Sequence, residues 1–202
     1  GLLEDEGMGT ERDEVYSGPC RCGKGTLQID YCQPDHAWPS GQKHWHECSV
    51  HCAACERLYV IQHRGRGFFY VEKAELKKLE ELSHAAYKRG QTLLKQERVQ
   101  ALLAQATSLL NAQSSVAAVH RLLQSKGFST NALPTFRKHW KGADAWLKDR
   151  ISPYSVDGLL SLLGVKDAAI SQEMGEIGKM QAASNTMPPT IKGPIYEYKQ
   201  SG

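Results

Sequence analysis

All six cysteines of this chain lie in one short stretch, between Cys20 and Cys55. The rest of the 202 residues contains none. Disulfides that stabilise a secreted protein are expected to be spread more widely, whereas a metal site gathers its ligands in one place. The clustering therefore indicates a metal-binding module in a reducing compartment, and we expect a cytoplasmic protein.

Two cysteine pairs offer natural ligands for zinc. Cys20 and Cys22 are followed by "GKGTLQI", whose glycines permit a tight turn, and Cys52 and Cys55 are followed by the apolar "ERLYVI". A structural zinc ion takes four thiolate or imidazole ligands in a tetrahedron. We therefore predict a Zn²⁺ site formed by these four residues. Because the first pair is spaced C-x-C, reserve ligands are also considered, namely Cys32, Cys48 and His51.

Strand-like segments surround the two pairs. The segments "TLQIDYC", "HWHECSV", "RLYVIQH" and "FFYV" are rich in β-branched and aromatic residues and are separated by turn residues. Two cysteine turns about 30 residues apart on such a hairpin resemble a zinc ribbon, over residues 19 to about 71 only. The C-x-C turn departs from the usual C-x-x-C of that family. A site closed by four protein ligands leaves no position for water, so we predict a structural zinc ion.

A second resemblance lies inside the predicted hairpin. Residues 34–41, "PDHAWPSG", resemble the start of an HNH endonuclease motif, in which an Asp-His pair binds a divalent ion and activates water. The resemblance implies catalytic roles for Asp35 and His36. It does not continue downstream, where Glu56 stands in place of the expected Asn and a predicted strand replaces the family's helix. A metal-dependent nuclease is our third hypothesis.

Helical periodicity begins at Glu72. Apolar residues then recur at helical spacing, first at Leu76, Leu79, Leu82 and Ala86. The pattern predicts one long helix over residues 72–112 or a helical pair hinged at Gly90. Residues 113–184 predict shorter helices. The expected fold class is α+β, with a small antiparallel β zinc module followed by a mostly helical region.

The two terminal segments lack both patterns. Residues 1–18 are acidic, and residues 185–202 hold three prolines. We predict flexible tails at both positions, the second of which could dock through Ile195, Tyr196 and Tyr198. The predicted parts of the chain are a tail (1–18), a zinc-ribbon-like module (19–71), a connector (72–112), a basic helical domain (113–184) and a second tail (185–202).

Residues 115–140, "SVAAVHRLLQSKGFSTNALPTFRKHW", have the pattern of a helix-turn-helix. The first helix would end at Gly127, Ser129 or Thr130 would cap the second, and Pro134 would lie in its first turn. Residues 121–150 carry a net charge of +5. The predicted outward-facing contacts to nucleic acid are Asn131, Thr135, Arg137, Lys138 and Lys141. A generic helical packing unit is the alternative.

These features favour a non-enzymatic, zinc-containing nucleic-acid-binding or regulatory protein, with duplex DNA as the favoured partner. Arg64, Arg66 and Trp45 are secondary candidates for nucleic-acid contact. The alternative is a protein–protein adaptor or inhibitor that docks on a larger nucleic-acid-processing machine. The connector helix could also form a homodimer. No apolar run approaches the roughly 18 to 20 residues of a membrane span.

Overall fold

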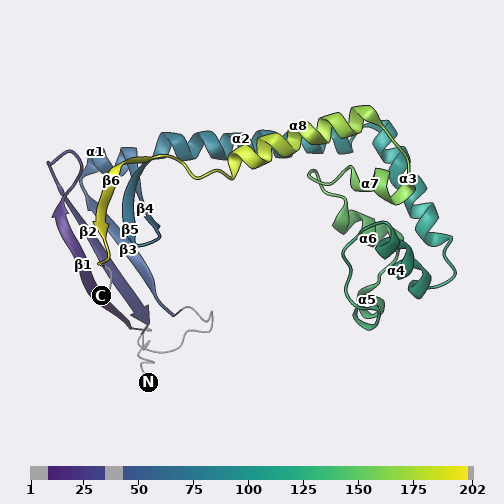
Figure 1. The fold of residues 1–202 in the computed structure, drawn as a ribbon, viewed down its shortest axis with the longest axis horizontal. Coiled ribbons are helices and arrows are strands. Elements are labelled where there is room, and N and C mark those ends of the chain that lie inside the picture. The colour runs from purple at the N-terminus through teal and green to yellow at the C-terminus, as the bar shows by residue number, and fades with distance from the viewer. Residues whose placement is uncertain (1–8, 35–42, 200–202) are drawn as a thin grey trace, which may run out of the picture. The chain divides into compact units, whose positions relative to one another are not determined.

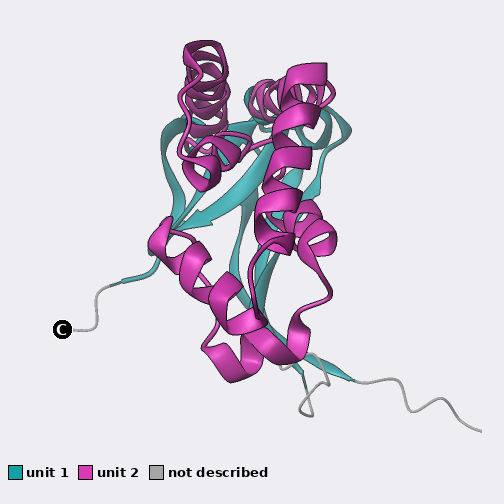
Figure 2. Ribbon diagram, turned by 90° about the vertical axis from the view of Figure 1, so that its right-hand side faces the viewer, with its two compact units in different colours: residues 1–77, 187–202 teal, residues 78–186 magenta. Residues whose placement is uncertain are grey.

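The computed structural model describes residues 9–34 and 43–199, which form two compact units (Figure 2). Unit 1 comprises residues 1–77 and 187–202, and unit 2 comprises residues 78–186. Antiparallel sheets lie in the first and helices dominate the second, so the predicted α+β class is confirmed. Within the described residues, no helix combines the length and the apolar character needed to cross a bilayer.

Unit 1 consists of two three-stranded antiparallel sheets (Figure 1). The first has the order β1-β2-β3, with β1 at Thr10–Pro19, β2 at Thr26–Pro34 and β3 at Trp45–His51. The second has the order β4-β5-β6, with β4 at Tyr59–Arg64, β5 at Gly67–Glu72 and β6 at Thr190–Glu197. A short helix, α1 (Ala53–Leu58), leads from the first sheet to the second.

The two sheets face one another across a small core. Leu27 and Ile29 on β2 and Phe68 on β5 are fully buried. The ring of His46 on β3 contacts Phe68 edge-on at 5.1 Å between centroids, and a tyrosine pair, Tyr16 and Tyr196, joins β1 to β6 at 5.8 Å. Burial of Leu27 and Ile29, two residues apart on β2, shows one face of that strand turned to the core, as the period of two requires.

Both predicted tails contain a strand. Residues 10–19 form β1, which pairs with β2 from Thr10 opposite Pro34 to Pro19 opposite Thr26. Residues 190–197 form β6, which pairs with β5, and the tyrosines at its end contact Phe68, as the docking prediction proposed. β6 depends on backbone pairing with β5, far along the chain, which local composition does not reveal. β1 pairs with the next strand but is rich in charged residues and lacks an apolar pattern. Residues 1–8 lie outside the described part.

Unit 2 is helical around its own core. Its helices are α2 (Lys73–Leu94, from residue 78 on), α3 (Glu97–Asn111), α4 (Val116–Ser125), α5 (Leu133–His139), α6 (Ala143–Arg150), α7 (Gly158–Leu163) and α8 (Ala168–Ser184). Fully buried side chains from five of them pack together, including Val99, Leu123, Leu147, Leu162 and Ile177. Apolar residues at helical spacing account for this core.

The connector breaks later than the sequence predicted. Helix α2 ends at Leu94 and α3 begins at Glu97, whereas Gly90 lies inside α2 and is buried. A Cβ atom at Gly90 would lie 2.1 Å from the carbonyl oxygen of Pro153. The glycine is therefore a point of close packing between α2 and the segment before α7, and not a hinge.

Candidate metal centre

The first cysteine turn links β1 to β2. The amide of Cys20 donates to the carbonyl of Gly25, and the amide of Gly23 donates to the carbonyl of Cys20, each at 3.0 Å. The amide of Gly25 also points at the sulfur of Cys20, 3.3 Å away. Gly23 has φ +78°, a conformation that glycine adopts without strain. The sequence "CRCGKG" therefore folds into a tight loop with a backbone donor aimed at sulfur.

The second cysteine turn is the start of α1. Cys52 is the extended residue that precedes the helix, and Cys55 lies within its first turn. The amide of Glu56 donates to the carbonyl of Cys52 at 2.9 Å, which closes this turn. Residues three apart project from the same side of a helical turn, so both sulfurs point the same way.

The two turns bring four sulfurs together. The Sγ atoms of Cys20, Cys22, Cys52 and Cys55 all lie within 4.8 Å of one another. The Cys20–Cys22 and Cys22–Cys52 sulfur pairs are each 3.5 Å apart. A tetrahedral zinc ion with Zn–S bonds of about 2.3 Å needs its sulfurs about 3.8 Å apart. The four predicted ligands therefore fit a zinc ion with only small adjustments.

The first turn is also fixed to the second sheet. The amide of Arg21 donates to the hydroxyl of Tyr70 on β5 at 3.1 Å. The Arg21 guanidinium lies over the ring of Tyr59 on β4, 5.6 Å from its centroid. The residue between the two cysteines of the first pair thus contacts the outer strand β4 and the central strand β5 of the other sheet. A metal ion at this point would join the two sheets at one end of unit 1.

Burial separates the four cysteines into two kinds. Cys20 and Cys55 are buried, whereas Cys22 is exposed and Cys52 is half-buried. Burial raises the pKa of the Cys55 thiol to about 12. Burial also opposes ionisation of Cys20, yet hydrogen bonds from the Cys22 thiol and the Gly25 amide lower the pKa of Cys20 to about 6. Four thiolates in such a space need a cation to balance them, as a divalent ion does.

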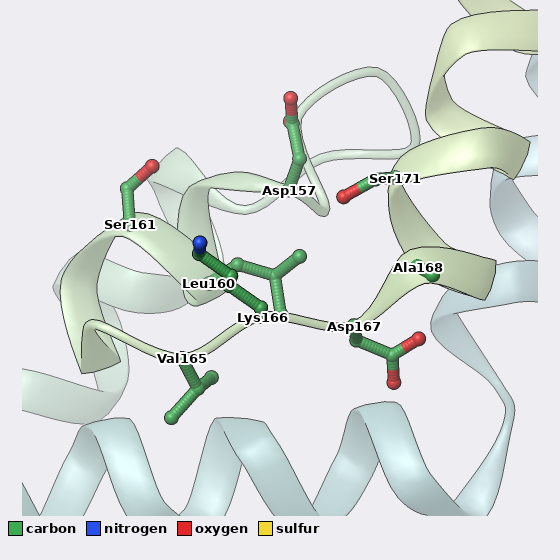
Figure 3. A pocket seen from close by; sticks show the side chains of 8 residues that line it. All are labelled: Asp157, Leu160, Ser161, Val165, Lys166, Asp167, Ala168 and Ser171. Atoms are coloured by element: carbon green, nitrogen blue, oxygen red, sulfur yellow. The ribbon is translucent and has the colours of Figure 1, made fainter.

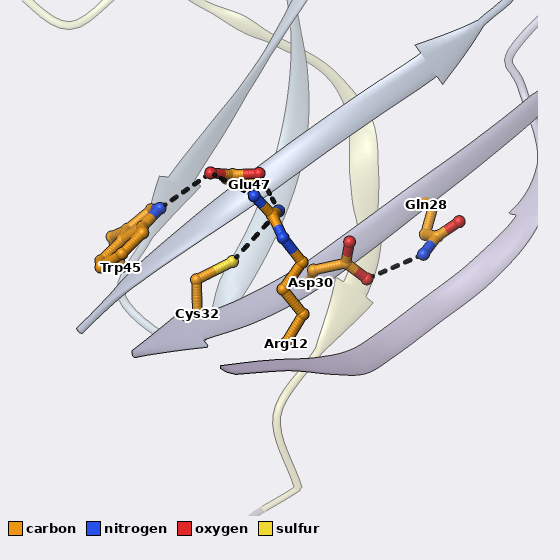
Figure 4. A network of polar contacts seen from close by, with 6 residues as sticks. All are labelled: Arg12, Gln28, Asp30, Cys32, Trp45 and Glu47. Atoms are coloured by element: carbon orange, nitrogen blue, oxygen red, sulfur yellow. Dashed lines mark hydrogen bonds and ion pairs between the residues drawn. The ribbon is translucent and has the colours of Figure 1, made fainter. Parts of the chain in front are cut away.

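The reserve ligands lie outside this cluster. Cys32 is buried on β2, with Nη1 of Arg12 3.6 Å from its sulfur, and burial raises its pKa (Figure 4). Cys48 is exposed on β3 by surface area, although neighbouring atoms partly desolvate its thiol and, with the Asp30 carboxylate, raise its pKa to about 11. His51 is exposed at the end of β3. The structure therefore favours the four-cysteine set over any replacement.

Two of the three secondary nucleic-acid candidates, Trp45 and Arg64, have structural contacts. The indole of Trp45 donates to Glu47 at 3.1 Å, and Glu47 also forms an ion pair with Arg12, which lowers the pKa of that carboxyl (Figure 4). Arg64 donates to the carbonyl of Pro188 at 2.6 Å and so holds the segment before β6. Arg66 is exposed.

The predicted helix-turn-helix is present as two helices with a different connection. Helix α4 is capped by the hydroxyl of Ser115, but the residue that precedes α5 is Ala132 instead of Ser129 or Thr130. The intervening residues 126–132 exceed the three to four of a DNA-binding turn. The reason is His120, a buried residue that sequence reasoning missed. Its Nε2 lies 2.8 Å from the carbonyl oxygen of Asn131 and thereby fixes a longer loop.

Of the residues predicted to face outward on the second helix, three lie on α5, whereas Asn131 precedes this helix and Lys141 follows it. All of them are exposed: Asn131, Thr135, Arg137, Lys138 and Lys141. Phe136 is buried and stacks on Trp140 at 5.4 Å. The polar face is thus accessible, although α5 is only seven residues long.

The HNH-like residues Asp35 and His36 lie outside the described residues. Downstream of the second cysteine pair, α1 ends at Leu58 and β4 follows at once. The predicted strand is therefore present from Tyr59 on, whereas Arg57 and Leu58, which were predicted to begin it, belong to α1.

Unit 2 has a hollow of about 550 Å³ between α7 and α8 (Figure 3). Its acids and base are Asp157, Asp167 and Lys166. The carboxylate of Asp167 is already engaged, because it accepts from the amide of Ile170 at the start of α8 and pairs with Arg98 at 3.4 Å. The Asp167 carboxylate therefore has a structural role at this hollow.

Comparison of the chain with protein-family models, curated proteins and solved structures found no match.

Proposed function

We propose that this chain is a non-enzymatic, zinc-containing protein that binds nucleic acid, with zinc holding unit 1 together and the basic helices of unit 2 contacting phosphate. The observation that carries the zinc part is the approach of four cysteine sulfurs to within 4.8 Å. Four thiolates complete the coordination of zinc and leave no position for a reacting water. The metal would then stabilise the fold and would not act as a catalyst.

The basic segment from α5 to α6 supports nucleic-acid contact. Five exposed bases lie along it: Arg137, Lys138, Lys141, Lys148 and Arg150. In the part of the chain that the structure describes, Arg137, Lys138 and Lys141 form no ion pair. Exposed, unpaired bases on one segment are typical of a surface that neutralises phosphates. The long loop before α5 favours backbone contact over base reading in the major groove.

Elemental analysis of the purified protein tests the zinc part of the proposal. We expect zinc that remains through gel filtration and that a strong chelator removes with loss of sheet structure. Metal-free protein with an unchanged thermal transition would refute a structural zinc ion.

Binding to a short DNA duplex at several salt concentrations tests the second part. The triple variant Arg137→Ala, Lys138→Ala, Lys141→Ala should reduce the slope of log affinity against log salt by about 3. The matched control removes the same charge from exposed sites elsewhere, at Lys24, Lys88 and Lys95. Equal losses in both variants would show that only net charge matters.

A protein–protein adaptor is the second candidate. Leu58 on α1 and Val165 after α7 are large apolar side chains with 47% and 41% of their surface exposed. Such positions can be contact points for a protein partner. DNA affinity that is absent at low salt would favour this candidate over the first.

A further inference from the structure

Unit 1 has a groove of about 650 Å³ between β3 and β4. Its lining is mixed. The apolar and aromatic side chains are Val50 from β3 and Tyr59, Val60 and Ile61 from β4, and the polar ones include His46, Ser49 and His51 from β3. At one end α1 connects the two strands. Towards the other end the rings of His46 and His63 approach to 4.8 Å between centroids. The groove is therefore a bounded opening along one side of the two sheets.

Both strands that line this groove are edge strands. β3 is the outer strand of the order β1-β2-β3, and β4 is the outer strand of β4-β5-β6. Within residues 9–34 and 43–199, no strand pairs with the outer side of either one. Half of the backbone N–H and C=O groups of an edge strand point away from its sheet and can pair with an added strand.

The other two edges of unit 1 differ from these. β1 has an irregular register between Glu14 and Tyr16. The pairing of β6 with β5 also has an irregular register, between Phe68 and Tyr70. β6 contains Pro194, and its Lys192 has a φ of 58°. Bulges, proline and lysine are the features by which edge strands avoid further pairing. β3 and β4 pair with their neighbours without a register shift and contain no proline or lysine.

Core-facing side chains of β3 are also uncovered in the groove. Cys48 lies opposite Ile29 and Val50 lies opposite Leu27 on β2. Ile29 and Leu27 are fully buried, whereas Cys48 is exposed and Val50 is half-buried. The apolar layer between the sheets therefore continues to the edge and meets solvent there.

The charge of the groove selects the kind of partner. Its fixed charges are one acid, Glu56, and one base, Lys73. Because the acid balances the base, the groove has no excess of positive charge and does not suit a phosphate backbone. It suits a neutral, extended polypeptide, whose backbone pairs with an edge strand and whose alternate side chains enter the groove.

We propose that the groove binds an extended segment of a partner protein as an added β-strand. From His46 to His51 the edge of β3 measures about 17 Å, which accommodates about five residues of the segment. The segment would insert apolar side chains at alternate positions and would have no proline in its centre. This site is distinct from the basic segment of unit 2 and does not depend on nucleic-acid binding.

A phage-displayed library of random heptapeptides, panned against the zinc-loaded full-length protein, provides the probe. Peptides that bind should alternate apolar and polar residues, and the best of them is synthesised with a fluorophore. Val50→Lys places a charge in the groove and should weaken its binding by at least about tenfold. The matched control is Val15→Lys, at the irregular position of β1, which should change affinity less than about twofold.

Ile61→Lys on β4 repeats the test if Val50→Lys loses zinc or unfolds. Amide exchange gives an independent readout, because the bound peptide should slow exchange in β3 or β4 and not in β1. The absence of enriched peptides, or binders with equal affinity for the groove variants and the control, would overturn the proposal. DNA affinity of the groove variants should remain unchanged, so failure here is distinguishable from failure of the proposed function.

Discussion

Replacing Gly25 with alanine should weaken zinc binding by about a hundredfold. An added Cβ would lie 2.2 Å from the carbonyl oxygen of His51 and 2.6 Å from the Cβ of Cys52. Neither atom can move by rotating a flexible side chain. The two cysteine turns would have to separate by about 1 Å to restore ordinary contact.

Zinc does not tolerate that separation. Ligand distances in zinc sites stay within about 0.2 Å of their usual values. Excess volume in a packed site costs about 1 to 3 kcal/mol, and we take the upper value because the obstacle is backbone. At about 1.4 kcal/mol for each tenfold change, about 3 kcal/mol corresponds to the hundredfold loss. The thermal transition of the zinc-loaded protein should fall as well.

Competition with a chromogenic chelator measures the change in zinc affinity. Two other glycines serve as controls. Gly23→Ala meets no atom within 4 Å but has φ +78°, so it should cost about 1 kcal/mol of backbone strain. Gly175→Ala, in open space on α8, should leave zinc affinity unchanged. Wild-type zinc affinity in Gly25→Ala would refute the argument that close approach of the two turns builds the site.

Three further predictions concern other positions. Cys55→Ser should abolish stable zinc binding in elemental analysis. Cys48→Ser should retain it, because Cys55 belongs to the four-cysteine cluster and Cys48 does not. Gly90→Ala should destabilise unit 2 by about 1 to 3 kcal/mol in urea unfolding, because its Cβ would clash with backbone 2.1 Å away. Burial, together with His63, lowers the pKa of His46 in the folded state. The unfolded state then binds more protons, so the free energy of unfolding should decrease as the pH is lowered below about 6.5. His46→Gln should reduce this pH dependence in thermal unfolding.

Local chemistry made the metal centre predictable from the sequence. The cysteine pairs lie two and three residues apart, and glycines stand where the first turn needs them. Strands β2 to β5 carry β-branched and aromatic residues that show their pattern within a few positions. The sequence could not show that Gly25 must approach Cys52 closely, since that contact joins two distant turns.

Long-range pairing and buried polar contacts explain the errors. β1 has charged residues along an edge, where Arg12 pairs with Glu47 of β3, so it has little apolar alternation. β6 contains glycine and proline and gains its structure from β5. The start of α5 depends on the contact of His120 with the Asn131 carbonyl. Each of these interactions connects positions that a local pattern treats separately.

The position of β6 has a consequence for synthesis on the ribosome. The last residue of β5 is Glu72 and the last of β6 is Glu197, so about 125 residues are translated between them. At about 5 to 20 residues per second, the edge of β5 that pairs with β6 stays unpaired for about 6 to 25 s. The nascent second sheet is a two-stranded hairpin during that interval, while the entire helical unit emerges. The smaller β unit is therefore completed only after the whole helical unit has been translated.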